Sequence, residues 1–126
     1  MDSDLLPADH DDTLPPKSRV LLDIAAERTR QDTKWGGPAH DDANLCLGDL
    51  AIGAAAYTLT AWTQFDGPPD RDISAAAREL AGRSPCNHKR DINTRTLLVR
   101  AAALIVAEIE RLDRQAIRTK TQAVQL

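Results

Sequence analysis

One short stretch of the chain, ERTRQDTKWGGPAHDD, concentrates charged, amide, imidazole and aromatic side chains. An indole ring can stack on a nucleobase while a guanidinium contacts a phosphate, and amide, imidazole and carboxylate groups add hydrogen bonds. The alternative is that the charges are ordinary solvated helix surface and that the glycine pair ends a helix. We expect five residues of this stretch to form one wall of a ligand site: Arg28, Gln31, Trp35, His40 and Asp41.

A basic segment leads into the last predicted helix. From Arg78 to Arg100, both included, there are six Lys or Arg residues, against only Glu79 and Asp91. The N-terminal end of a helix attracts anions, and arginine adds bidentate contacts to phosphate. The alternative is a solvated charged loop. We expect three arginines to form the phosphate side of the site: Arg90, Arg95 and Arg100.

Other chemistries lack their sequence signatures. His40, Cys46, Cys86 and His88 have atoms suited to zinc but not the short paired spacing of a zinc site. No P-loop, G-x-G-x-x-G, G-x-S-x-G or H-E-x-x-H motif occurs. Cys46 lies between two leucines, which favours a core position over a nucleophile. We therefore predict no catalytic residue, no metal and no cofactor.

Composition indicates the setting of this candidate site. The 126 residues carry a net charge of −3, which argues against general nucleic-acid binding. No apolar run is long enough to span a membrane, and the two cysteines indicate free thiols rather than a disulfide framework. We expect a cytoplasmic protein of a bacterial host. Residues 1–14, rich in aspartate, predict a disordered tail, and residues 15–126 a single helical domain.

Hydrophobic periodicity predicts an all-α fold, a small bundle of about four helices with one long C-terminal helix. The first spans residues 17–35, with Val20, Leu21 and Ile24 on its apolar face, and ends at the glycine pair. The second spans residues 43–65 and is capped by Asp41 or Asp42.

The third predicted helix, residues 74–82, is capped by Asp72. The fourth begins near Asp91 or Asn93 and runs beyond Arg114, with Glu110 and Arg114 paired on its wet side. Its apolar stripe should pack on the Ala-rich second helix and contains Leu97, Ala101, Leu104, Ile105, Ile109 and Leu112. Because a chain of this length has a thin core, we expect a homo-oligomer.

Two blocks of the chain resemble a known family. ERTRQDTKWGGPAHDD resembles the opening motif of phage-borne members of the all-α nucleotide pyrophosphatase superfamily, the MazG-like proteins. LLVRAAALIVAEIERLDR resembles their later packed helix. The chain is also similar to a group of phage proteins with the same ER-x-RQ, HDD and AEIERLDR blocks. The resemblance implies a four-helix fold and oligomerisation, with nucleotides bound between helices.

The sequence departs from those enzymes in its metal ligands. They bind Mg²⁺ with Glu-x-x-Glu on one helix and further acids on the next, because two ions need several converging carboxylates. The corresponding helix here, LGDLAIGAAAY, has Asp49 as its single acid. By analogy to phage anti-defence sponge proteins, we expect a phage or prophage protein that sequesters a nucleotide-derived immune signal, of the cyclic nucleotide or cyclic ADP-ribose type, without hydrolysing it.

Two alternatives stay open at this point. One is a divergent Mg²⁺-dependent nucleoside triphosphate pyrophosphatase that uses Asp49, Glu108, Glu110 and Asp113. The other is a helical protein that binds and inhibits a host protein through its long helix. The low acid count of the Ala-rich helix favours the binding protein over the enzyme.

Overall fold

A computed structural model describes residues 13–44, 48–65, 67–68, 70–83 and 92–125. Within these ranges the chain forms five helices and no strand, which confirms the all-α class and the long C-terminal helix. The helices are α1 (Pro16–Trp35), α2 (Gly37–Asn44), α3 (Asp49–Trp62), α4 (Arg71–Arg83) and α5 (Thr94–Gln125). Predictions for the N-terminal tail, Cys46, Cys86, His88 and Arg90 fall outside the described residues.

The segment after α1 differs from the sequence prediction. Gly36 ends α1 as expected, with φ +98° in the left-handed region and its N–H bonded to the Asp32 carbonyl. A further short helix, α2, follows at once, because Pro38 suits the first turn of a helix as well as it ends one. Asp41 and Asp42 therefore lie inside α2, and their prediction as caps of the next helix is wrong.

The predicted helix over residues 43–65 is in fact divided. α2 ends at Asn44 and α3 begins at Asp49, preceded by Gly48 at φ +81°, a conformation that disfavours side chains. Asp70, and not Asp72, caps α4, since its carboxylate accepts from the N–H groups of residues 72 and 73. α5 begins next to Asn93, one of the two expected starts, and Asn93 caps it by accepting from the Thr96 N–H at 2.8 Å.

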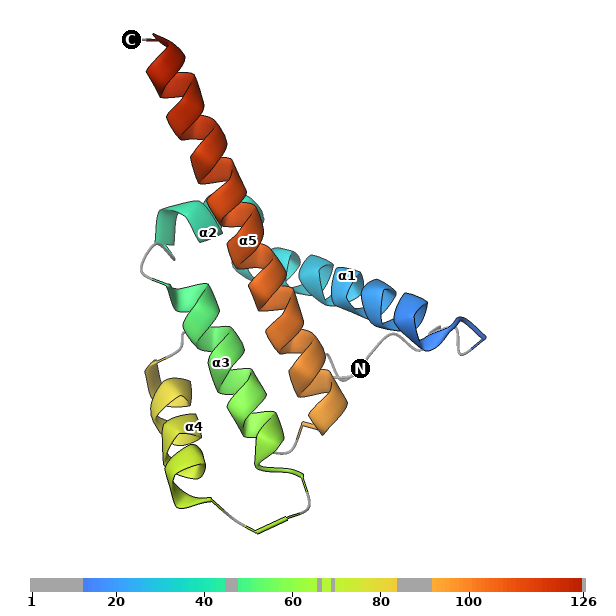
Figure 1. The fold of residues 1–126 in the computed structure, drawn as a ribbon. Helices are drawn as coiled ribbons and strands as arrows, with labels where there is room; N and C mark the ends of the chain where they lie inside the picture. The colour runs from blue at the N-terminus through green and yellow to red at the C-terminus, as the bar shows by residue number, and fades with distance from the viewer. Residues whose placement is uncertain (1–12, 45–47, 66, 69, 84–91, 126) are drawn as a thin grey trace.

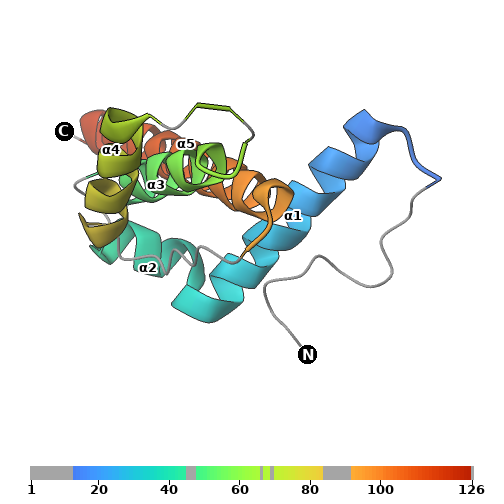
Figure 2. The ribbon, with the colours of Figure 1, turned by 90° about the horizontal axis from the view of Figure 1, so that it is seen from below.

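The helices are arranged in a row with α5 near the centre. Figure 1 shows α3 beside α5, α4 on the outer side of α3, and α1 on the other side of α5, with α2 joining α1 to the α5 midsection. The C-terminal turns of α5 extend past the other helices. Seen from below, the first turns of α1 also project away from the bundle (Figure 2).

The apolar core lies mainly between α3 and α5. Small side chains on α3 allow this close approach, and Tyr57, Leu97 and Leu104 are its largest fully buried side chains. Trp35 packs against the same cluster from the end of α1. The remaining core residues are Leu50, Ala54, Ala61, Ile92, Ala101 and Ala107.

Helix α1 presents an unexpected face to the bundle. The sequence predicted an apolar face around Val20 and Leu21, but Leu21 is 59% exposed. The buried residues of α1 are instead Asp23, Glu27 and Gln31. The reason lies on α5, where the Arg95 guanidinium binds Asp23 and the backbone carbonyl of Arg100 accepts from Gln31, so the polar side of α1 finds its partners there.

The apolar stripe predicted for α5 is divided in the same way. Leu97, Ala101 and Leu104 pack into the core against α3, as expected. Ile105, Ile109 and Leu112 do not, and each is about half exposed. One helix therefore carries two apolar faces, of which the described part of the chain covers one.

Candidate functional site

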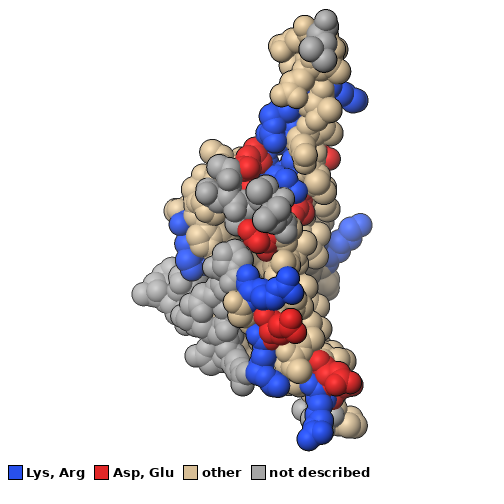
Figure 3. Space-filling model, turned by 90° about the vertical axis from the view of Figure 1, so that its left-hand side faces the viewer, with Lys and Arg blue, Asp and Glu red and all other residues tan. Residues whose placement is uncertain are grey.

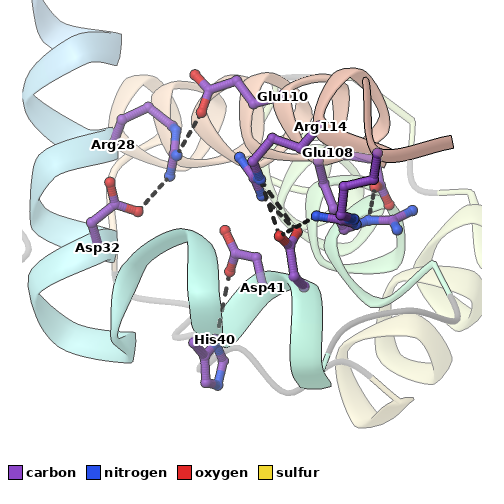
Figure 4. A network of polar contacts seen from close by, with 10 residues as sticks. Arg28, Asp32, His40, Asp41, Glu108, Glu110 and Arg114 are labelled. Atoms are coloured by element: carbon purple, nitrogen blue, oxygen red, sulfur yellow. Dashed lines mark hydrogen bonds and ion pairs between the residues drawn. The ribbon is translucent and has the colours of Figure 1, made fainter. Parts of the chain in front are cut away.

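Charged side chains from three helices meet where α1, α2 and α5 come together (Figure 4). At its centre, two arginines one helical turn apart on α5 share one carboxylate of α2. Arg114 donates to Asp42 through Nε and Nη2, the shortest distance being 2.9 Å, and Arg118 donates through Nη1 at 3.0 Å. The bond from Arg114 lowers the pKa of Asp42 below its usual value, and Asp42 in turn raises the pKa of Arg114.

Arg28 extends this cluster to α1. Its guanidinium donates to Asp32 on the same helix and to Glu110 on α5, both at 3.1 Å. Its Nε is buried and has no hydrogen-bond partner among the described residues. Glu110 therefore pairs across the helices with Arg28 and Arg114 with Asp42, in place of the predicted Glu110–Arg114 pair on the wet side.

His40 and Asp41 lie beside Arg28, Arg114 and Arg118, which together form the arginine layer. Asp41 is buried, and its carboxylate oxygen is 3.7 Å from Nδ1 of His40, which is one-third exposed. Burial raises the pKa of Asp41 above its usual value, while His40 and Arg28 act in the opposite direction. The pair offers an acceptor and a partly exposed imidazole next to three guanidinium groups.

A second polar region lies between α1 and α5. Gln31 is 2% exposed and donates through Nε2 to Glu27 at 2.9 Å and to the carbonyl of Arg100 at 3.5 Å. Arg30 holds the same Glu27 with two bonds of 2.7 Å. Arg100 is 3% exposed and lies over the Tyr57 ring at 6.0 Å. This region is a closed polar interface that holds α1 against α5.

The first predicted wall is brought together only in part. Arg28, His40 and Asp41 meet at the α1–α2–α5 junction, as expected from their spacing. Gln31 points into the closed α1–α5 interface instead. Trp35 packs against the core, and the Lys34 ammonium lies over its ring at 5.6 Å, so a stacked base would have to displace Lys34.

The predicted phosphate side does not join this wall within one chain. Arg95 donates to Asp23 at 2.6 Å, and Arg100 is buried. Because a helix rises about 1.5 Å per residue, Arg95 lies roughly 28 Å along α5 from Arg114. A small ligand cannot touch both. Arg90 falls outside the described residues.

The acids proposed for an enzyme are dispersed. Glu108 accepts from Arg111, Glu110 from Arg28, and Asp49 lies in the first turn of α3. In the ranges that the structure describes, no three His, Cys, Asp or Glu side chains are grouped to hold a metal ion. The described acids therefore give no specific support to a two-metal mechanism.

Sequence reasoning missed the arginine pair of α5 and its partner, Asp42. The available signals were the four-residue spacing of Arg114 and Arg118 and the second aspartate of the HDD block. Neither signal says which way the side chains point, since that depends on how α2 crosses α5. On the face drawn in Figure 3, basic and acidic side chains lie next to each other rather than in patches of one sign.

Comparisons with known protein families, with curated proteins and with solved structures find no match for this chain. The relationship to the MazG-like proteins therefore stays a prediction from the two sequence blocks. None of the helices in the described part of the chain is long and apolar enough to cross a membrane.

Proposed function

We propose that this chain is a non-catalytic binding protein for a small nucleotide-derived ligand, held at the α1–α2–α5 junction. The observation that carries the proposal is the convergence of Arg114 and Arg118 on one carboxylate, with Arg28 on the adjacent helix. Two guanidinium groups around a single anionic group form a geometry that also suits a phosphate. Asp42 then acts as an internal stand-in that keeps both arginines in place.

The neighbouring groups fit the rest of a nucleotide. His40 is partly exposed and can hydrogen-bond a base or a ribose, and the buried Asp41 lies 3.7 Å from its Nδ1. The α1–α2 connection is fixed by Gly36, so these groups are positioned before a ligand arrives. The proposed biological role is sequestration of a cyclic nucleotide or cyclic ADP-ribose type signal by a phage or prophage anti-defence protein, which would act as a homo-oligomer.

Because Asp42 competes with a phosphate for the two arginines, variants of Asp42 and of the arginines should change ligand affinity in opposite directions. A phosphate must take the arginines from Asp42, so Asp42→Asn, which removes the competing charge and keeps the shape, should tighten binding. Arg114→Gln and Arg118→Gln should each weaken binding about tenfold or more, since each removes a charge-assisted hydrogen bond. Arg83→Gln on α4, an exposed arginine with a weak 3.9 Å contact to Glu79, is the matched control.

Titration calorimetry would use cyclic dinucleotides, cyclic trinucleotides and cyclic ADP-ribose isomers. Heat with one of these probes, together with opposite effects of the Asp42 and arginine variants, supports the proposal. The absence of heat with every probe removes it. Pyrophosphate release from nucleoside triphosphates that EDTA abolishes would replace it with the enzyme. Recovery of one stoichiometric host protein, insensitive to nucleotide, would replace it with the inhibitor.

A further inference from the structure

The exposed face of α5 carries a regular apolar seam that none of the described helices covers. Its positions follow alternating steps of four and three residues, the spacing of a coiled-coil seam. The seam runs along the side of α5 opposite to the arginine layer. Its members are Leu98, Ala102, Ile105, Ile109, Leu112 and Ala116.

Helix α3 widens this seam into a groove. A hollow of about 490 Å³ lies between the two helices, walled on one side by Ala51, Ala55 and Thr58 and on the other by Ile105 and Ile109. Small residues on α3 thus lie beside large, half-exposed residues on α5. A surface that carries both a depression and projecting apolar side chains can pair with a copy of itself.

We infer that this α3–α5 face binds a second copy of the chain, with the two α5 helices antiparallel. The register follows from side-chain size. If the symmetry axis passes at residue 107, Leu98 faces Ala116 of the partner subunit, and Ala102 faces Leu112 of the partner subunit. Ile105 then faces Ile109 of the partner subunit. Every layer between the seams pairs large with small, or Ile with Ile, as interdigitating cores require.

The size of the face agrees with this occupant. The seam from Leu98 to Ala116 is about 27 Å long, and with α3 beside it the face is about two helix diameters, roughly 20 Å, wide. Each copy therefore covers about 500 Å², and the pair about 1,000 Å², which is where specific interfaces begin. The charged group that lines the groove, Glu108, already pairs with Arg111, so its burial leaves no lone carboxylate.

This register also accounts for the projecting end of α5. The turns beyond Ala116 extend past the other helices of their own chain (Figure 1). In the antiparallel pair they continue alongside the first turn of the partner's α5.

Sedimentation of the full chain without ligand tests the inference independently of the proposed function. We expect a dimer at micromolar concentration. Ile109→Arg should raise the dimer dissociation constant at least about thirtyfold, the effect of losing a central anchor. Leu22→Arg on α1 is the matched control, because Leu22 and Ile109 are similarly exposed, at 57% and 53%. A monomeric wild type, or equal effects of both variants, would overturn the inference.

A size exchange tests the antiparallel register. Ala102→Leu should clash with Leu112 of the partner subunit, and Leu112→Ala should leave a gap, so each weakens the dimer. The double variant exchanges the two sizes, and we expect its dissociation constant to return to within about threefold of the wild type. Additive losses in the double variant would rule out this register.

Discussion

Replacement of Gln31 by glutamate tests whether α1 is held to α5 by a paired polar interface. The Gln31 amide is buried and donates to the Glu27 carboxylate at 2.9 Å. Gln31→Glu keeps the shape of the side chain but removes this donor and places a second carboxyl against the first.

The size of the effect follows from these contacts. A hydrogen bond to a charged group contributes about 1.5–3 kcal/mol. Two carboxylates about 3 Å apart repel by roughly 5 kcal/mol at an effective dielectric constant of about 20. Arg30 offsets part of this repulsion, since it holds Glu27 with two bonds, and the new carboxyl can take up a proton instead. We expect a net loss of about 3 kcal/mol at pH 7, a large share of a small domain's stability.

The pH dependence gives the deciding measurement. The new carboxyl has a raised pKa in the folded state, so the folded variant binds more protons than the unfolded one and gains stability as the pH falls. In urea unfolding followed by circular dichroism, the loss should shrink to about 1 kcal/mol near pH 4.5. Gln115→Glu, exposed on α5, should change stability by less than about 0.5 kcal/mol. Equal losses for the two variants, or a loss independent of pH, would refute the reasoning.

Three further predictions concern a helix cap, a buried carboxyl, and a buried leucine compared with an exposed one. Asn93→Ala should lower the free energy of unfolding by about 1 kcal/mol in urea titrations, because the first turn of α5 loses its cap. Burial raises the pKa of Asp41 in the folded state, so the folded protein holds a proton on this carboxyl more tightly than the unfolded chain does. The free energy of unfolding should therefore fall as the pH rises through the folded-state pKa of Asp41. Asp41→Asn should abolish this fall in unfolding titrations from pH 3.5 to 7. Leu97→Ala should cost about 2–5 kcal/mol, whereas Leu21→Glu should change stability by less than about 0.5 kcal/mol, and thermal unfolding that ranks them in reverse would contradict the burial of α1.

The sequence predicted the residues that act locally. Gly36 ends α1 and α5 begins next to Asn93 as expected, because helix ends depend on a few neighbouring residues and on backbone conformation. The all-α class and the long last helix follow from periodicity for the same reason. Pro38 misled the prediction, since the residue that ends one helix here also opens the next.

The candidate site could be predicted only in part. Arg28, His40 and Asp41 come from adjacent segments, so their short spacing in the chain was enough to bring them together. Arg114 and Arg118 reach the same place from more than 70 residues further along, through the crossing of α2 and α5. No local pattern encodes such a crossing.

The sequence by itself determined that α1, α3, α4 and α5 contain helix, that α1 ends at Gly36, and which residue types were available for a polar site. Tertiary structure decided which side of each helix is covered. On α1 the side with Asp23 and Glu27 is buried while Leu21 is exposed, and on α5 the seam around Ile109 is uncovered. The physical reason is that periodicity identifies an apolar face, but burial depends on the partner opposite, and α5 offers α1 the Arg95 guanidinium and the Arg100 backbone carbonyl.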